Sequence, residues 1–310
     1  MDLLDALTYE FQSGEALAAD LGVSRAAVSK AAKVLIDDGY PVDVERSRGY
    51  KLHWGTPSPR MLATLNVRAV TRPYRYLGTL DSTQDELRRW AEEGAPGGAV
   101  VVAERQQHGR GRHGRIWESH PGISLTFSVL LRPSTPVAQL PLISLAAGVA
   151  IAEAISPGRG GLKWPNDLLG PGGGKLAGIL VEARTSGEET TYVLVGIGVN
   201  VEPPAPPDGA VLNTVPGRNA QHRAYVLDRI LEELEAAFAL LAEPTAVVRA
   251  WKEHSNMMGT RVRVETPAGT ISGHARDIDP TGALIVATPD GDEVIHAGDV
   301  TLVREEGTDG

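Results

Sequence analysis

Apolar and polar residues recur at helical spacing in the first sixty residues, broken by Gly22. Ser24 follows that glycine, where it can cap a second helix. The segment 42–52 then alternates in a way that is typical of a two-stranded wing. This order of elements predicts a winged helix-turn-helix over residues 1–60. The Pro/Ser-rich segment 55–60 is predicted to be a linker.

Longer apolar runs follow from residue 61 to about residue 256. The runs at 99–103, 123–131, 176–181 and 193–201 predict buried strands. One-sided apolar spacing at 221–242 predicts an amphipathic helix that packs on the core.

Short strand-like runs with Pro, Gly and Asp turns replace this pattern from residue 257 onward, which predicts a small β domain over 257–310. The last seven residues, 304–310, are expected to fray.

Composition narrows the functional classes. The chain of 310 residues is 42% hydrophobic and contains no cysteine, which excludes disulfides, thiolate metal sites and a cysteine nucleophile. Asp2 and Asp5 stand where a signal peptide would need basic residues, and no apolar run reaches membrane-spanning length. We therefore expect a cytoplasmic protein without a membrane span.

The charge of the N-terminal region is segregated. Residues 1–60 hold seven Lys/Arg and nine Asp/Glu, so their net charge is 7 − 9 = −2. The basic residues nevertheless gather on the second helix and the wing, as DNA-phosphate contacts require. The residues predicted to bind DNA are Arg25, Lys30, Lys33, Arg46 and Arg48. A helix-turn-helix that serves only as a dimerisation element or spacer is the alternative.

A basic loop stands out against the formal net charge of −9. Between Arg105 and Arg115 the chain places four arginines, two histidines, three glycines and no carboxylate. Glycines let backbone N–H groups approach an anion, and arginines add bidentate donors. The string Gly109-x-Gly111-x-x-Gly114 matches a dinucleotide fingerprint, but a strand follows the loop instead of the required helix. We predict an anion site between two strands; an ordinary basic turn is the alternative.

Segment 162–183 contains a glycine run before Lys175, but Leu176 stands where a P-loop needs Ser or Thr. Asp167 and Lys175, separated by this short loop, can together hold a magnesium-bound phosphate. A plain surface hairpin is the alternative.

Two polar segments complete the candidate site. Residues 81–84 open a helix with short polar side chains, and Asp81 or Ser82 would also suit a helix cap. The run 193–201 is a strand interrupted by Gly196 and Gly198 and ends near Asn200. Glycine inside a strand marks close approach of a ligand or of another backbone.

In this order, the strings DSTQ, AERQQHGRGRHGRIW, KWPND, KLAGILVE and GIGVN across residues 78–201 resemble the biotin–protein ligase family. The resemblance implies an α+β protein. It would have an N-terminal winged helix-turn-helix, a central mixed-sheet ligase domain like the class II synthetases, and a C-terminal SH3-like β-barrel. Lipoate ligases share the fold, but the chain lacks the Arg-Arg-x-x-Gly-Gly-Gly type of string expected of them.

The resemblance also implies an ATP-dependent biotin–[biotin carboxyl-carrier protein] ligase, with ATP and biotin as its substrates and Mg as its cofactor. Its partners would be a biotin carboxyl carrier protein of acetyl-CoA carboxylase or a relative, operator DNA and, with adenylate bound, a second copy of the chain. The N-terminal layout is similar to that of biotin ligases that also repress biotin genes.

Residue roles are carried over from the motifs. The biotin-binding residues would be Ser82, Thr83, Gln106, Arg110 and Lys175. The nucleotide would contact Arg112, Arg115, Trp117 and Asn200. Lys175, Arg110 and Arg112 would be catalytic, and Asp167 would support magnesium. Gln84 departs from the Asn usual in its string, and Val303 falls where the family has an arginine, with Arg304 as its shifted counterpart.

Three other functions stay open at this point. The chain could be a biotin-sensing repressor without ligase activity, although Arg110, Arg112 and Lys175 together argue against that. It could be a monofunctional ligase with a vestigial helix-turn-helix, which its basic second helix and wing argue against. A ligase for lipoate or another acyl group is the third.

Overall fold

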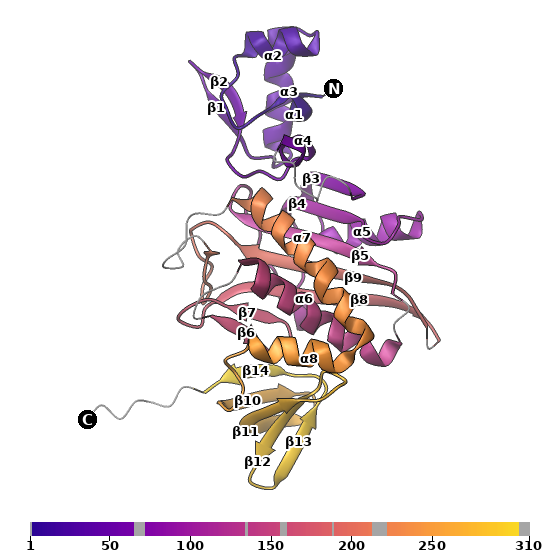
Figure 1. Ribbon diagram of the computed structural model, residues 1–310. Helices are drawn as coiled ribbons and strands as arrows, with labels where there is room; N and C mark the ends of the chain where they lie inside the picture. The colour runs from indigo at the N-terminus through magenta and orange to yellow at the C-terminus, as the bar shows by residue number, and fades with distance from the viewer. Residues whose placement is uncertain are drawn as a thin grey trace, which may run out of the picture.

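The computed structural model describes residues 2–64, 72–133, 136–155, 160–187, 189–212 and 222–303. Its strands form three separate sheets of two, seven and five strands. Figure 1 shows the two smaller sheets at opposite ends of the molecule, with the seven-stranded sheet and its helices between them. In no described segment is there a helix long and apolar enough to cross a bilayer.

The N-terminal region is a winged helix-turn-helix, as predicted. Its elements are α1 (Leu3–Ala6), α2 (Gly14–Leu21), α3 (Arg25–Asp37), β1 (Val42–Glu45) and β2 (Gly49–Leu52). The hydroxyl of Ser24 accepts from the backbone N–H of Ala27 and caps α3. Gly22 adopts φ +66° at the end of α2, a conformation that glycine adopts without steric cost.

The predicted linker is a buried joint. Thr56 and Ser58 are almost fully buried, and α4 (Pro59–Thr64) begins within the predicted linker. The hydroxyls of Tyr9 and Tyr74 donate to the carbonyls of Thr56 and Pro57 at 2.9 and 2.7 Å. These bonds give the connection a defined conformation, which its composition did not predict.

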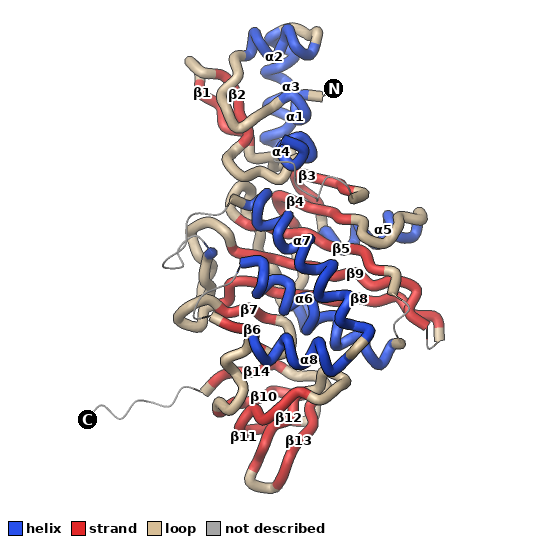
Figure 2. The backbone as a smooth tube through the Cα atoms, viewed as in Figure 1, coloured by secondary structure: helices blue, strands red, loops and turns tan. Residues whose placement is uncertain are grey.

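The central sheet has the strand order β3-β4-β5-β9-β8-β7-β6, in which only the β3–β4 pair is parallel. The strands are β3 (Tyr74–Leu80), β4 (Val100–Gln106), β5 (Ser124–Leu131), β6 (Gly161–Lys163), β7 (Asp167–Leu169), β8 (Lys175–Ser186) and β9 (Glu189–Asn200). The loop between β4 and β5 holds only a 3₁₀ turn (Arg112–Gly114), so the rejected dinucleotide motif is indeed absent. Figure 2 shows this sheet in red behind the blue helices.

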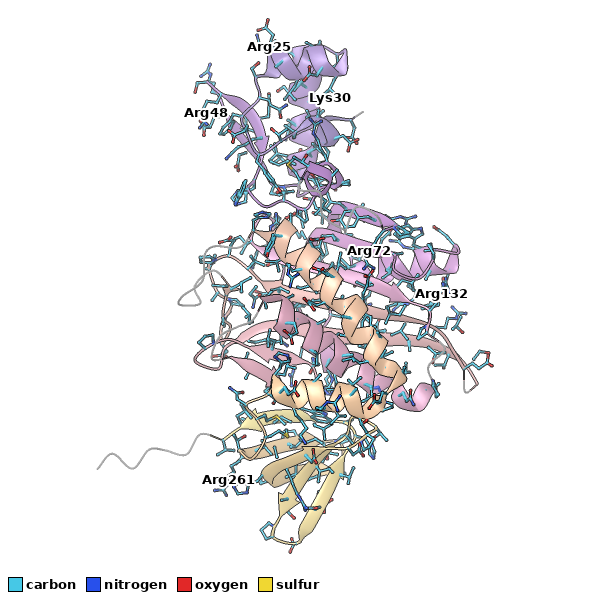
Figure 3. All side chains as sticks on the ribbon, viewed as in Figure 1. Arg25, Lys30, Arg48, Arg72, Arg132 and Arg261 are labelled. Carbon is cyan, nitrogen blue, oxygen red and sulfur yellow. The ribbon has the colours of Figure 1, made fainter. Side chains whose placement is uncertain are left out.

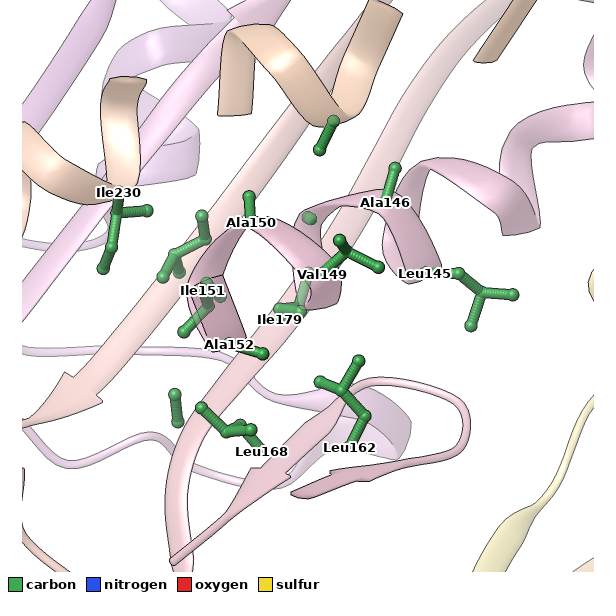
Figure 4. Packing of buried hydrophobic residues seen from close by; sticks show 14 of the residues in the cluster. Leu145, Ala146, Val149, Ala150, Ile151, Ala152, Leu162, Leu168, Ile179 and Ile230 are labelled. Carbon is green, nitrogen blue, oxygen red and sulfur yellow. The ribbon is translucent and has the colours of Figure 1, made fainter. Parts of the chain in front are cut away.

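Helices cover the two faces of this sheet unequally. Helices α6 (Leu140–Ile155), α7 (Arg223–Ala239) and α8 (Pro244–Glu253) belong to one large core. In that core α6 packs against β6, β7 and β8 (Figure 4). Helix α5 (Thr83–Glu92) packs on the opposite face against β4, β5 and β9. Side chains alternate between the two faces along β9. Val193 and Val195 belong to the large core under α6, α7 and α8, and Leu194 belongs to the smaller core under α5.

The C-terminal region is the predicted small β domain. Its strands are β10 (Arg261–Thr266), β11 (Gly269–Ile278), β12 (Leu284–Thr288), β13 (Gly291–Ile295) and β14 (Asp299–Leu302), all antiparallel. The indole N–H of Trp164 donates to the carbonyl of Gly282 at 2.9 Å and ties this domain to the central one. The expected fraying of 304–310, and Arg304 with it, lies outside the described residues.

Candidate functional site

The site lies on the α5 face of the central sheet, beyond the part that α5 covers. Register pairs Thr126 with Gly198 and Gly198 with Gly178 across β5, β9 and β8. The next row on this face contains Ser128 and Gly196, also paired. Hydroxyls and glycines here replace the large apolar side chains found elsewhere on the sheet, and they leave room for a cavity of about 500 Å³.

The cavity gathers every residue that the sequence predicts for substrate, nucleotide or metal binding. These residues are Ser82, Thr83, Gln106, Arg110, Arg112, Arg115, Trp117, Asp167, Lys175 and Asn200. They come from the start of α5, the end of β4, the basic loop, β7, β8 and β9, so folding brings together segments far apart in sequence.

Short polar side chains at the start of α5 line one end of the cavity. Ser82 caps α5 by accepting from Gln84 N, and it also lines the cavity. Capping a helix and lining the site are therefore compatible for this residue. The N–H and hydroxyl of Thr83 both donate to Gln106 Oε1, at 2.8 and 3.1 Å. Ser128 lies 2.8 Å from that hydroxyl. The result is a linked set of small donors and acceptors, suited to a neutral polar ring.

Gln84, whose role was open, has a structural partner set. Its side-chain amide donates to the carbonyls of Leu180 (3.0 Å) and Leu194 (3.4 Å) on β8 and β9. A Cβ at Gly196 would lie 3.0 Å from Gln84 Cδ. The longer glutamine therefore fills the space over Gly196 and bonds α5 to the sheet.

The basic loop forms a small hairpin. Trp117 N donates to Gly109 O at 2.9 Å, and Gly111 N donates to Arg115 O at 2.8 Å. A Cβ at Gly109 would lie 2.3 Å from Trp117 O, so glycine permits this close approach. Arg110 and Arg112 on this hairpin are partly buried, whereas residues 113–116 are exposed.

Arg110 is bound to α5. Its guanidinium donates to both oxygens of Asp85, at 2.6 and 2.8 Å. These hydrogen bonds lower the pKa of Asp85 and raise that of Arg110. The side chain of Arg110 therefore holds the loop against the helix.

Arg112 and Arg115 connect the loop to the C-terminal domain. Arg112 donates to Gly298 O (3.1 Å) and Asn166 Oδ1 (3.3 Å). Arg115 forms an ion pair with Asp299, which lies 3.5 Å from Arg112 as well. Burial lowers the pKa of Arg112 from its ordinary value. The C-terminal domain thus forms one wall of the site.

Trp117 lies flat on the two paired glycines. A Cβ at Gly198 would lie 2.2 Å from Trp117 Cε2, and one at Gly178 would lie 3.0 Å from Cζ3. Lys175 Nζ lies 5.4 Å from the indole ring centroid. The indole N–H is buried and has no acceptor among the described residues. The two glycines therefore leave room for the indole ring, and the ring and both glycines line the cavity.

Lys175 and Lys163 share one carboxylate. Asp167 Oδ1 lies 2.7 Å from Lys175 Nζ, and Oδ2 lies 3.3 Å from Lys163 Nζ. No cluster of three or more His, Cys, Asp or Glu side chains occurs in the described ranges. A lone carboxylate held between two ammonium groups does not fit a preformed magnesium site, and it fits an orienting partner for Lys175 better.

Asn200 lies at the end of β9 and is buried. Its side-chain amide donates to the carbonyl of Lys175 at 3.1 Å, which links the two candidate residues. Nearby, the Asn166 amide donates to Ile179 O at 3.0 Å and fixes the turn that carries Asp167.

Four further residues of the site escaped prediction: Lys163, Asn166, Asp85 and Asp299. Lys163 and Asn166 stand inside the KWPND string, so that motif was the available signal. Asp85 and Asp299 carry no motif signal, because the basic-loop arginines that they bind are 25 or more positions away in sequence.

The predicted DNA-binding side chains are all exposed on the N-terminal domain. Figure 3 shows Arg25 at the outer end of this domain and Arg48 on the wing, and neither lines the cavity. Arg48 lies 4.1 Å from the Phe11 ring centroid and pairs with Glu45. Lys33 pairs with Asp37 on the same helix at 2.8 Å. These surface pairs are weak and can exchange for phosphates.

The comparisons with known proteins agree with this architecture. The model of the "Biotin/lipoate A/B protein ligase family" matches residues 76–200. The model "Biotin protein ligase C terminal domain" matches 258–303, and "HTH domain" matches 2–51.

Individual proteins are similar along most of their length. The bifunctional ligase/repressor BirA of Bacillus subtilis is 32% identical, over 97% of each chain. The biotin–[acetyl-CoA-carboxylase] ligase of Mycobacterium tuberculosis is 39% identical over 72% of this chain and 86% of its own. The Aquifex aeolicus biotin protein ligase, solved with biotin and ATP, superimposes with a TM-score of 0.62. It is 29% identical and covers 75% of this chain and 99% of its own. This chain therefore belongs to the biotin/lipoate A/B protein ligase family, with an added N-terminal helix-turn-helix and a biotin protein ligase C-terminal domain.

Proposed function

We propose that this chain is a biotin–protein ligase that also represses transcription. The observation that carries the ligase function is the single cavity that combines small polar groups at α5 with Lys175, Arg112 and Arg115. Relatives named as biotin–[acetyl-CoA-carboxylase] ligases support biotin over lipoate as the substrate.

The reaction has two steps. An oxygen of the biotin carboxylate bonds to the α-phosphorus of ATP, the bond to the β-phosphate breaks, and pyrophosphate leaves. A lysine amine of a carrier domain then attacks the acyl carbon of biotinoyl-AMP and displaces AMP. Both steps join species that the site must position, and positioning alone supplies effective molarities up to ~10⁵–10⁸ M.

The residues divide this work by chemistry. Ser82, Thr83 and Gln106 are suited to hold the ureido ring, because they present donors and acceptors without net charge. Lys175 is suited to neutralise charge that develops at the α-phosphate. Arg112 and Arg115 line the same cavity and would meet phosphate oxygens, and Arg110 would order the loop that carries them.

The adenosine would lie toward Trp117 and Asn200. A flat indole on a glycine floor offers a stacking surface, and Asn200 offers an amide at the same end of β9. Magnesium would come with the nucleotide phosphates, since Asp167 is already engaged by two lysines.

The decisive experiment combines the purified chain with ATP, magnesium, biotin and a carboxyl carrier domain, and measures the intact mass of the carrier. A gain of one biotinyl group, lost when lipoate replaces biotin, is expected. Adenylate formation without transfer would leave only the biotin-sensing alternative.

For repression, we propose that α3 enters a DNA groove and that the wing contacts the backbone. Exposure, which phosphate contacts require, is shared by Arg25, Lys30, Lys33, Arg46 and Arg48, and none of them lines the ligase cavity. Protection of the promoter of its own operon in a footprint tests this. No protection at any biotin concentration would indicate a monofunctional ligase.

We propose further that biotinoyl-AMP promotes a homodimer, because helix-turn-helix domains usually bind as dimers on half-sites about one helical turn apart. The adenylate can shift this equilibrium only by binding the dimer more tightly. Sedimentation with and without adenylate tests the step, and unmodified carrier is expected to compete with dimerisation.

The domain limits proposed are 1–60, 61–256 and 257–310, supported by the three separate sheets.

A further inference from the structure

Four charged side chains close a ring beside the cavity. Arg110 bonds Asp85 at 2.6 Å, and Asp85 pairs with Arg88 at 2.5 Å. Arg88 pairs with Glu182 at 2.5 Å, and Glu182 lies 3.6 Å from Arg110. Two cations and two anions alternate, so the ring carries no net charge.

The ring joins three elements that each contribute to the cavity. Arg110 is the first arginine of the basic loop hairpin. Asp85 lies in the first turn of α5, just after Ser82 and Thr83, and Arg88 lies about one turn further along the helix. Glu182 lies on β8, which also carries Lys175 and Gly178. A change at any one of these elements is therefore transmitted to the loop through the ring.

The ring sits at an intermediate depth that suits a local anchor. Its four side chains are between 31% and 37% exposed. Ion pairs at such exposure contribute little to global stability. Such pairs can still order a short surface loop, because opening the loop exposes it to solvent without unfolding the rest of the protein. The lowered pKa of Asp85 agrees with a carboxylate that stays charged in this pairing.

We propose that Asp85 is a positioning residue, which with Arg88 and Glu182 holds Arg110 and thereby keeps the basic loop folded over the site. The guanidinium of Arg110 then serves the loop, and backbone N–H groups together with Arg112 meet the anions. The ligand-retention part of this inference rests on the proposed ligase function; the loop-ordering part does not.

Hydrogen exchange of the ligand-free chain tests loop order without any activity. In Asp85→Asn, the N–H groups of Gly111 and Trp117, which close the hairpin, are expected to exchange about tenfold faster. The matched control is Glu86→Gln, one position along, whose partners Arg75 and Arg89 lie away from the loop. Unchanged exchange in Asp85→Asn, or equal change in both variants, would overturn the proposal.

Kinetics distinguish anchoring from direct contact. Asp85→Asn is expected to raise the KM for biotin about tenfold and change kcat less, with Asp85→Glu restoring much of the loss. Because both residues act through one pair, Asp85→Asn/Arg110→Gln is expected to be no worse than Arg110→Gln alone. Additive losses would mean that Asp85 and Arg110 act independently, and the anchor would be rejected. A wild-type chain that transfers no biotin would refute the proposed function, while the exchange result still decides the anchor.

Discussion

The chain contains two arginine–carboxylate pairs of the same chemistry in opposite surroundings. Arg223 donates to both oxygens of Glu104 at 2.8 Å, and both side chains are at most 2% exposed. Arg110 also donates to both oxygens of Asp85, there from two guanidinium nitrogens, but each of these side chains is 35% exposed. The first pair lies at the junction with the N-terminal domain, and the second lies at the basic loop.

Burial decides what each pair does. Glu104 also accepts from the hydroxyl of Tyr76 and from Gly122 N, and Arg223 reaches Ser124 O and Thr56 Oγ1. With so many fixed partners, loss of either charge leaves the other desolvated. The exposed pair keeps water as an alternative partner, so the loop can rearrange at low cost. The comparison predicts that the Arg223–Glu104 pair stays formed as long as the protein is folded, whereas the Arg110–Asp85 pair can open and close.

The largest effect is expected at the buried pair. Arg223→Ala should lower the free energy of unfolding by ~3–5 kcal/mol, because it strands the Glu104 carboxylate. Denaturant unfolding measures this. Arg229→Ala on the same helix, which loses only partly exposed pairs with Glu232 and Glu233, should cost less than ~1 kcal/mol. Equal costs would show that burial does not distinguish the two kinds of pair.

The next effect concerns a cation kept near the surface for chemistry. Lys175→Ala should slow adenylation by about 10²–10³-fold and leave biotin affinity nearly intact, because the lysine meets charge that develops at phosphorus. Pre-steady-state pyrophosphate release measures the step. Lys252→Ala is the control, since this lysine pairs with Asp277 outside the cavity, and it should leave the adenylation rate unchanged. If biotin affinity collapses in Lys175→Ala while the adenylation rate holds, Lys175 orients biotin instead.

Local signals explain what the sequence could predict. Ser24, Gly22 and the basic loop act within a few residues of themselves. Capping and motif order therefore located the winged domain and the ten predicted residues that line the cavity. Helix α6 could not be found by amphipathic spacing, because buried residues occur on all its sides. The Arg110–Asp85 pair of the ring spans 25 positions and the buried Arg223–Glu104 pair spans 119, so only the folded chain brings these partners together.

A smaller effect is expected on the glycine floor, where no charge is involved. Gly198→Ala places a methyl group where the Trp117 ring lies and should weaken ATP binding about 10–100-fold. The fold should survive, because the indole is partly exposed and can move away. Titration of ATP against tryptophan fluorescence reports both changes. Normal affinity with an unshifted emission spectrum would show that the ring does not need the glycine.

The smallest effect is the pH dependence of the exposed pair, and it tests the comparison most directly. Arg110 lowers the pKa of Asp85 below its unfolded value of ~3.9, so the pair stabilises the folded state fully above that pH. The contribution is lost as pH falls through the folded pKa. The stability difference between wild type and Asp85→Asn should therefore stay below ~1 kcal/mol near neutrality and vanish in acid. Thermal unfolding of both proteins from neutral pH down to about pH 3 measures it. A difference of several kcal/mol would mean that the exposed pair behaves like the buried one, and the distinction by burial would fail.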